Sequence, residues 1–233
     1  MSQPLMSSRA QRRSFLTRLG AGLAGLTGGV LAAPRAASAQ TSAPAFHPTR
    51  HAQDDWLDRV PGQHRFVFDT TTTDGFGMGL AFANNFYLAN QSGYGLKDAE
   101  VAVVIVARHN STALAYNEAM WTKYGATLGA RAGLTDPRTK QPATANLYTS
   151  AVPGLPNRGT TIDNLIARGA HFAVCGMASR FLAGEIAKAT GGNADTVLAE
   201  LTANLVPNAH LMAAGILAVN RAQERGYTLA VAS

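Results

Sequence analysis

The stretch Val101-Ala-Val-Val-Ile-Val106 decides the fold. It is apolar at every position rather than at alternate positions, which is typical of a strand buried on both faces of a parallel sheet. A helix on each side of it in the sequence would complete an α/β unit. The helix before it is predicted by the spacing of Met78, Phe82, Phe86 and Ala89. The helix after it is predicted by Leu114, Met120, Trp121 and Tyr124, and we expect it to end at Gly125.

Apolar runs and helical spacing alternate along the rest of the chain. The other predicted strands are Arg65–Thr70, His171–Cys175, Ala209–Met212 and Tyr227–Val231. The other predicted helices are Thr161–Arg168, Arg180–Ala189, Asp195–Leu205 and a segment with Met212, Ile216, Val219 and Gln223 on one stripe. Alternating strands and helices predict an α/β protein, a three-layer α/β/α sandwich with a mostly parallel sheet of about five strands.

Residues 126–158 interrupt this alternation of strands and helices. They have no sustained period and contain four prolines, at positions 137, 142, 153 and 156. A stretch of this length without secondary structure is usually a lid or another functional excursion. We place it inside one domain of residues 63–233 and expect it to cover the functional site.

Positive charge is concentrated at the N-terminus. The 233 residues carry a formal net charge of +6, but residues 1–39 contain five arginines and no acidic residue. Removing those five from the 20 basic residues leaves 15, against 14 acidic residues. The remaining chain is nearly neutral, so its charge does not predict nucleic-acid binding.

Residues 1–39 have the order of an export signal. The pair Arg12-Arg13 is followed by Phe15-Leu16, a mildly apolar stretch from Leu19 to Ala33, and the small residues Ala37-Ser-Ala39. This order predicts a twin-arginine signal peptide, export through the twin-arginine translocase and a periplasmic protein without a stable membrane span. A buried core helix and a mitochondrial transit peptide are the alternatives. Residues 40–62, rich in Pro, Ala, Asp and Gln, are predicted to be a tether.

Candidate site residues follow the predicted strands. Ligands of open parallel sheets bind at the carboxyl ends of the strands. Asp69 and Thr70 end the first strand, Arg108-His109 follow the second, and Cys175 ends the third. We therefore expect these residues to converge on one edge. His171 begins its strand and belongs to the opposite edge.

Cys175 is the most distinctive of these residues because it is the single cysteine of the chain. It has no partner for an intrachain disulfide or a Cys-x-x-Cys redox pair. Its place between a strand and a helix N-terminus favours the thiolate, which is the reactive form. Arg108 and His109 would stabilise that anion. Two other possibilities remain open: Cys175 could be a buried inert residue, and Arg108 could be a structural ion-pair partner.

No cofactor or metal is predicted. Gly75, Gly77 and Gly79 follow a strand and open a helix, but Leu80 stands where a dinucleotide-binding motif requires glycine. A metal site formed by His109, Cys175 and His210 is conceivable, although ligands so scattered in sequence are weak evidence. A structural role is the better hypothesis for His210.

Two segments resemble the DsrE/DsrF-like superfamily. They are HFAVCGMA (171–178) and LVPNAHLMAAGILAVNRAQERGYTLAVA (205–232). VVIVARHNSTAL (103–114) and the first strand and helix, with Asn84-Asn85, fit the same plan. The resemblance covers roughly residues 65–231. It implies a compact α/β/α domain that forms homo-oligomers, and a cysteine after the third strand that carries sulfur as a persulfide in some members. Cys175 matches that cysteine.

Two hypotheses about function follow. In the first, the protein handles sulfane sulfur on Cys175, with Arg108 and His109 stabilising the anion, and exchanges it with a donor or acceptor protein. In the second, it is a non-catalytic periplasmic module that binds a small molecule or a partner, with Cys175 structural. A homo-oligomer is expected in either case. Phe86, Tyr87 and Trp121 are its candidate contacts, unless these aromatic side chains fill the core.

Overall fold

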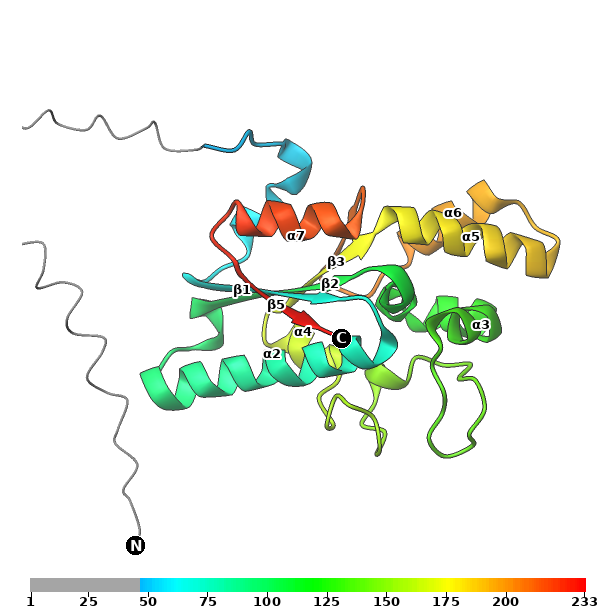
Figure 1. The fold of residues 1–233 in the computed structure, drawn as a ribbon, viewed down its shortest axis with the longest axis horizontal. Coiled ribbons are helices and arrows are strands. Elements are labelled where there is room, and N and C mark those ends of the chain that lie inside the picture. The colour runs from blue at the N-terminus through cyan, green and yellow to red at the C-terminus, as the bar shows by residue number, and fades with distance from the viewer. Residues whose placement is uncertain (1–46) are drawn as a thin grey trace, which may run out of the picture. The chain divides into compact units, whose positions relative to one another are not determined.

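A five-stranded, all-parallel sheet forms the centre of the fold (Figure 1). The computed structural model describes residues 47–233. The strands are β1 (His64–Thr70), β2 (Val101–Ala107), β3 (His171–Cys175), β4 (Ala209–Met212) and β5 (Thr228–Ala232), in the order β4-β3-β2-β1-β5. The predicted signal peptide and residues 40–46 of the predicted tether lie outside the described residues.

Helices connect successive strands, which confirms the predicted α/β sandwich. The connecting helices are α2 (Thr73–Tyr94), α3 (Glu118–Ala132), α4 (Ile162–Ala167), α5 (Gly176–Thr190), α6 (Ala194–Ala203) and α7 (Gly215–Gln223), and helix α1 (Trp56–Arg59) precedes β1. Short 3-10 helices are η1 (Ala52–Asp54), η2 (Asp98–Glu100), η3 (His109–Ala115) and η4 (Leu147–Thr149). Within residues 47–233, no helix has both the length and the hydrophobicity that crossing a bilayer requires.

The strand order decides which helices cover which face. From β1 to β4 the chain moves in one direction across the sheet, so right-handed crossovers keep α2 to α6 on one side. The connection from β4 to β5 returns past β1, and the same handedness places α7 on the other side. Figure 1 shows α7 and α2 on opposite faces of the sheet.

Strand β2 is buried at all seven positions, as its sequence predicted. Val103 and Ile105 belong to the core cluster beneath α2, α3 and α5. Val104 and Val106 belong to the cluster beneath α1 and α7. Both faces of the strand therefore lie in apolar surroundings, which is why the period-2 alternation of a half-exposed strand is absent.

The buried face of α2 is not the predicted one. Phe76, Leu80, Ala83 and Tyr87 form it, whereas Phe82 of the predicted stripe is 42% exposed. The helix is apolar on two faces, and the spacing of four and three residues fits both of them. The packing against the sheet, which the helix sequence does not contain, selects one face.

Two of the three residues predicted to make oligomer contacts lie in the core. Tyr87 and Trp121 are each 1% exposed, so that expectation is wrong for both. Phe86 is half-buried and packs on Phe66, with ring centroids 4.9 Å apart. The homo-oligomer itself stays a prediction, which a size measurement with and without reductant would test.

Helix α3 extends past Gly125, where we expected it to end. It continues to Ala132 and is capped by Gly133, whose φ of 68° is in the left-handed region. Gly125 and Gly129 are four residues apart and lie on one side of the helix. The chain at Ala143 and Thr144 passes so close to them that a Cβ on either glycine would overlap a carbonyl oxygen. These glycines allow the chain at residues 143–144 to pack closely against α3. The excursion without regular periodicity begins only after α3 ends at Ala132.

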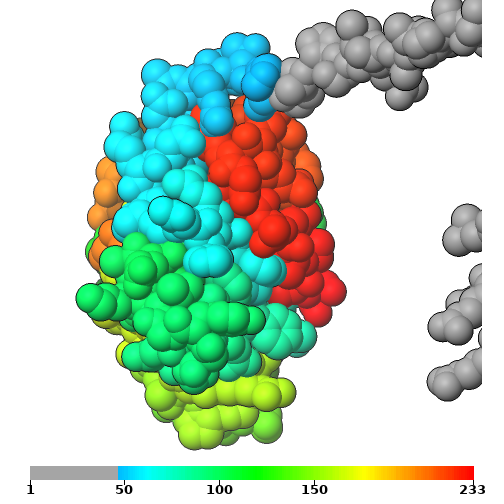
Figure 2. Space-filling view, turned by 90° about the vertical axis from the view of Figure 1, so that its left-hand side faces the viewer, coloured from blue at the N-terminus to red at the C-terminus, as the bar shows by residue number. Residues whose placement is uncertain are grey.

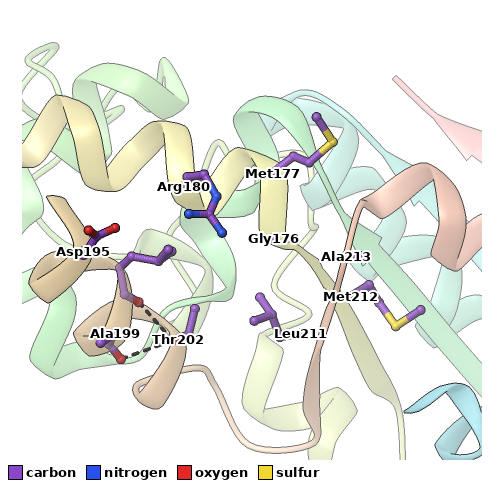
Figure 3. A pocket seen from close by; sticks show the side chains of 10 residues that line it. Gly176, Met177, Arg180, Asp195, Ala199, Thr202, Leu211, Met212 and Ala213 are labelled. Carbon is purple, nitrogen blue, oxygen red and sulfur yellow. Dashed lines mark hydrogen bonds between the residues drawn. The ribbon is translucent and has the colours of Figure 1, made fainter. Parts of the chain in front are cut away.

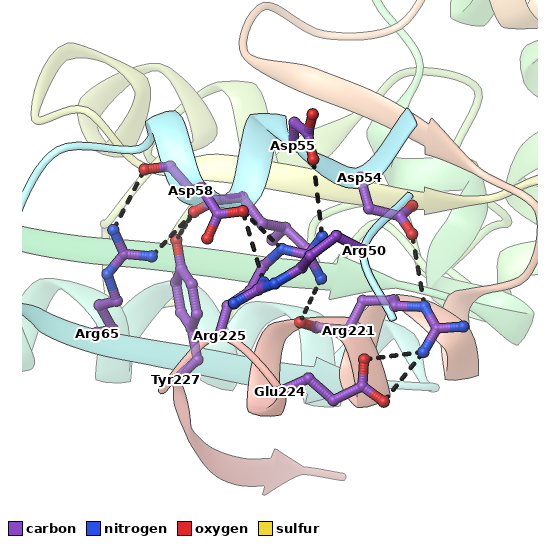
Figure 4. A network of polar contacts seen from close by, with 10 residues as sticks. Arg50, Asp54, Asp55, Asp58, Arg65, Arg221, Glu224, Arg225 and Tyr227 are labelled. Carbon is purple, nitrogen blue, oxygen red and sulfur yellow. Dashed lines mark hydrogen bonds and ion pairs between the residues drawn. The ribbon is translucent and has the colours of Figure 1, made fainter. Parts of the chain in front are cut away.

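The predicted tether is wrong for residues 52–60. Trp56, Leu57 and Val60 are buried, and they cover the sheet beside α7. Figure 4 shows the polar contacts that hold this segment. The side chain of Arg225 is fully buried and donates to Asp58 at 3.0 Å, and Tyr227 Oη donates to the Leu57 carbonyl at 2.8 Å.

The acidic residues that suggested a solvated tether therefore pair with arginines from the far end of the chain. Asp54 is 3.5 Å from Arg221, in addition to the Asp58–Arg225 pair. In Figure 2 the N-terminal part of the described chain, in blue, lies directly against the C-terminal part, in red.

Candidate functional site

A pocket of about 360 Å³ opens where β2, β3 and β4 end. After β3 the chain continues into α5 on one face of the sheet, and after β4 it continues into α7 on the other face. The connections of these two neighbouring strands diverge, which leaves a crevice at their carboxyl ends. Cys175, Arg108 and His109 all line this pocket. The predicted convergence of these three residues on one edge of the sheet is confirmed.

Cys175 ends β3 and is the N-cap of α5. Its Sγ accepts a hydrogen bond from the Ala178 backbone N–H at 3.4 Å. Its carbonyl oxygen accepts from Ser179 Oγ at 2.9 Å, and Ser179 Oγ in turn accepts from Tyr116 Oη at 2.7 Å. Both partners are fully buried, and burial raises the pKa of Tyr116 above its ordinary value. This buried relay fixes the backbone that carries the sulfur.

Gly176 lets the turn after Cys175 pass close to β4. A Cβ on Gly176 would lie 2.7 Å from the carbonyl oxygen of Met212, closer than real side chains approach. The backbone that follows Cys175 can therefore approach the end of β4 closely because position 176 has no side chain.

Arg108 forms a bidentate ion pair with Asp69. Its Nε and Nη2 donate to the two carboxylate oxygens at 2.7 and 2.8 Å. The hydrogen bonds to Asp69 are the main cause that raises the pKa of Arg108 above its ordinary value. Asp69 is buried, so Arg108 supplies the counter-charge to a carboxylate that is largely removed from water. The structural alternative left open for Arg108 is therefore shown, although the side chain still lines the pocket.

His109 lies exposed at the rim of the pocket. It adopts a φ of 57°, which is uncommon for a residue other than glycine. Ser111 holds this turn, because its Oγ accepts from the Arg108 N–H at 3.0 Å and lies 2.9 Å from the Thr70 carbonyl, to which it can donate. Thr70, which we expected near the site, instead hydrogen-bonds within this buried turn.

The expected lid does not cover Cys175. Residues 133–158 pack elsewhere: Asn146 Nδ2 donates to the Leu114 carbonyl at 2.8 Å, and Tyr148 Oη donates to the Thr73 carbonyl at 3.0 Å. Of the segment 126–158, only Arg131 lines the pocket, and it belongs to the last turn of α3. The excursion fills space beside α2 and η3 because its apolar residues and its amide and hydroxyl groups find partners there.

Sequence reasoning missed Arg131, Met177 and Phe181. Arg131 hydrogen-bonds Asn110 and lies over the ring of Phe181, 5.1 Å from its centroid. Met177 and Phe181 are 70% and 52% exposed and lie four residues apart on α5. These two apolar side chains do not share the helical spacing of the residues that α5 buries, and this mismatch was the sequence signal for an exposed apolar pair. No sequence pattern linked them to Arg131.

A larger pocket of about 600 Å³ adjoins the first, and Met177 lines both. Figure 3 shows it between α5, α6 and β4, with Arg180, Asp195 and Thr202 around it. Cys175 does not line it. We assign the candidate chemistry to the smaller pocket because it contains the thiol.

The three residues of the conceivable metal site do not come together, because His210 does not line the pocket that contains His109 and Cys175. Among residues 47–233, no three His, Cys, Asp or Glu side chains are grouped so that they could hold a metal ion. His210 instead stacks on Trp56, with centroids 3.9 Å apart, and its Nε2 lies 3.0 Å from Nδ1 of His171. The structural role preferred for His210 is confirmed.

This histidine pair predicts a loss of stability in acid. Burial is the main cause that lowers the pKa of His210 to about 4, and neighbouring His171 and Arg59 lower it further. Burial also lowers the pKa of His171. Between pH 6.5 and 4, His210 binds a proton in the unfolded chain but not in the folded protein. The free energy of unfolding therefore decreases as the pH is lowered. We expect a loss of about 2 kcal/mol, less than the full pKa shift implies because the ring is only partly buried.

Urea unfolding measured across this pH range checks the expectation. His210→Phe keeps an aromatic ring against Trp56 and removes the titrating group, so its stability should fall less between pH 6.5 and 4. An equal fall in both proteins would contradict the assignment.

The chain matches no known protein-family model and no curated protein sequence.

Proposed function

We propose that this protein carries sulfane sulfur as a persulfide on Cys175. The supporting observation is the place of the thiol: Sγ lies at the N-terminus of α5, in the wall of an open pocket that two arginines also line. Reactive thiols occur at helix N-termini and beside guanidinium groups, and this pocket has both. The resemblance of the segments around Cys175 and β5 to the DsrE/DsrF-like superfamily supports the same chemistry.

The proposed reaction transfers one sulfur atom between two thiols. The thiolate of Cys175 attacks the outer sulfur of a persulfide donor, a new S–S bond forms, and the donor leaves as a thiolate with the electron pair of the broken bond. In the reverse direction, an acceptor thiolate attacks the outer sulfur and Cys175 leaves as a thiolate. The Ala178 N–H donates to Sγ, and Arg108 and His109 line the pocket in which the anion forms. No other redox partner is needed.

Intact-mass measurement tests the proposal. After incubation with polysulfide or a persulfide donor, the full chain should gain the mass of one sulfur atom, and the gain should disappear after treatment with dithiothreitol. Cys175→Ser should show no adduct. An adduct of equal amount on Cys175→Ser, or no adduct on the native protein, would contradict the proposal.

A non-catalytic binding module is the second candidate. It is favoured by the capping of α5 by Sγ and by the low exposure of Cys175, 7%, which also fit a structural cysteine. The alkylation rate of the folded protein by iodoacetamide separates the two. Reaction before unfolding supports sulfur chemistry, whereas reaction only in denaturant supports the binding module.

We also propose that the protein acts in the periplasm after export by the twin-arginine route. The support is the order of the arginine pair, the apolar stretch and the small residues within residues 1–39. Replacing Arg12 and Arg13 by lysine should leave an unprocessed precursor in the cytoplasm. Normal cleavage and export of that double variant would instead indicate the general secretory route.

A further inference from the structure

Arg131 differs from the other arginine of the Cys175 pocket in its partners. Arg108 is neutralised by Asp69, whereas no ion pair joins Arg131 to a carboxylate within residues 47–233. The Arg131 guanidinium is nevertheless held in place. It hydrogen-bonds the side-chain oxygen of Asn110 and stacks over the ring of Phe181.

This arrangement leaves one uncompensated positive charge in the wall of the pocket. A guanidinium has five N–H donors, and Asn110 occupies only part of this capacity. Phe181 orders the planar group without neutralising it. The remaining donors suit the paired oxygens of a sulfonate or carboxylate. The pocket therefore combines a nucleophilic sulfur with a binding group for an oxyanion.

We infer that Arg131 binds the oxyanion end of a small sulfane-sulfur donor, of which thiosulfate is the simplest member. The inference rests on the proposed sulfur chemistry of Cys175 and names its substrate class. A pocket of about 360 Å³ accommodates such a donor beside the thiol. Arg131 is a specificity-determining residue, since it holds the end of the donor that does not bond to Cys175.

The transfer from thiosulfate balances without a further reactant. The Cys175 thiolate attacks the outer sulfur of thiosulfate and forms an S–S bond. The S–S bond of thiosulfate breaks, and its electron pair leaves with sulfite. The products are a persulfide anion on Cys175 and sulfite, with the same total charge as the reactants. Arg131 holds the sulfonate oxygens, which become the oxygens of sulfite.

Two alkylating agents of nearly equal size test the oxyanion site without sulfur transfer. Iodoacetate is anionic and iodoacetamide is neutral, and both reagents alkylate accessible thiols. The rate ratio of iodoacetate to iodoacetamide should fall about tenfold in Arg131→Gln, the effect of one charge-assisted hydrogen bond. Arg180→Gln is the matched control, because it removes the same charge from the neighbouring pocket and should leave the ratio unchanged.

Loading with thiosulfate tests the substrate class. In the native protein, mass spectrometry should show one added sulfur and an equivalent release of sulfite. Arg131→Gln should raise the thiosulfate concentration needed for half-maximal loading about tenfold. Its loading rate at saturating thiosulfate should change much less, which separates loss of binding from loss of reactivity.

The outcomes distinguish this inference from the proposed function. An unchanged alkylation ratio in Arg131→Gln, or the same fall in Arg180→Gln, overturns the role of Arg131 even if Cys175 takes up sulfur from polysulfide. Uptake from polysulfide but not from thiosulfate overturns the substrate class. A charge-dependent alkylation ratio without sulfur uptake from any donor overturns the proposed function and leaves an anion-binding pocket.

Discussion

Arg108→Met is expected to lower the free energy of unfolding by about 3 kcal/mol, because it leaves the Asp69 carboxylate without its counter-charge. The side chain of Asp69 is 5% exposed and that of Arg108 28%, so water can compensate little of the loss at Asp69. Methionine keeps most of the aliphatic length that packs against Gly215. The change therefore removes mainly the charge, and urea unfolding of the full chain measures its effect.

Asp69→Asn supplies the control. In the Arg108→Met background it removes the unpaired charge, so it should restore part of the lost stability. Asp69→Asn alone should cost less than Arg108→Met, since the partly exposed guanidinium can be hydrated. If Arg108→Met were as stable as the native protein, the Asp69–Arg108 pair would have no structural role.

Gly129→Ala is expected to lower the free energy of unfolding by about 2 kcal/mol, although alanine is normally the better helix former. The added Cβ would overlap the carbonyl oxygen of Ala143, and a backbone atom cannot swing aside as a side chain can. Either α3 or the chain at 143–144 must shift. The cost of that shift exceeds the gain in helix propensity, which is about 1 kcal/mol.

Gly184→Ala is the matched comparison. Gly184 lies in the interior of α5, and a Cβ there would meet no atom within 4 Å. This substitution should raise the free energy of unfolding by up to about 1 kcal/mol. Opposite signs for the two glycines would show that the close approach of the excursion to α3 determines the effect. A stabilising Gly129→Ala would contradict the packing described for residues 143–144.

The sequence alone predicted the strands and the edge of the sheet where the candidate site lies. Strand β3 has the predicted bounds His171–Cys175, and β2 ends one residue beyond the prediction. Both segments are short and apolar; β2 lies between Glu100 and Arg108, and β3 lies between Gly169-Ala170 and Gly176, so the local pattern specifies them. The convergence of Arg108 and Cys175 then follows from the rule that parallel strands end at one edge.

Features that depend on contacts with residues far away in the sequence could not be predicted from the local pattern. Asp54 and Asp58 look like parts of a solvated tether until Arg221 and Arg225 are placed beside them. Gly125 resembles a helix terminator until the chain at Thr144 is seen to pass over it. In each case the local residues fit two structures equally well.

The sequence by itself determined the α/β class, the strand positions and the place of Cys175 at a strand end, because these depend on local periodicity and on the geometry of parallel sheets. Only the tertiary structure decided which face of α2 is buried, where the excursion packs and that Arg131 joins the Cys175 pocket. Those features depend on contacts between segments far apart in the chain, where packing and charge pairing, rather than local preference, set the free energy.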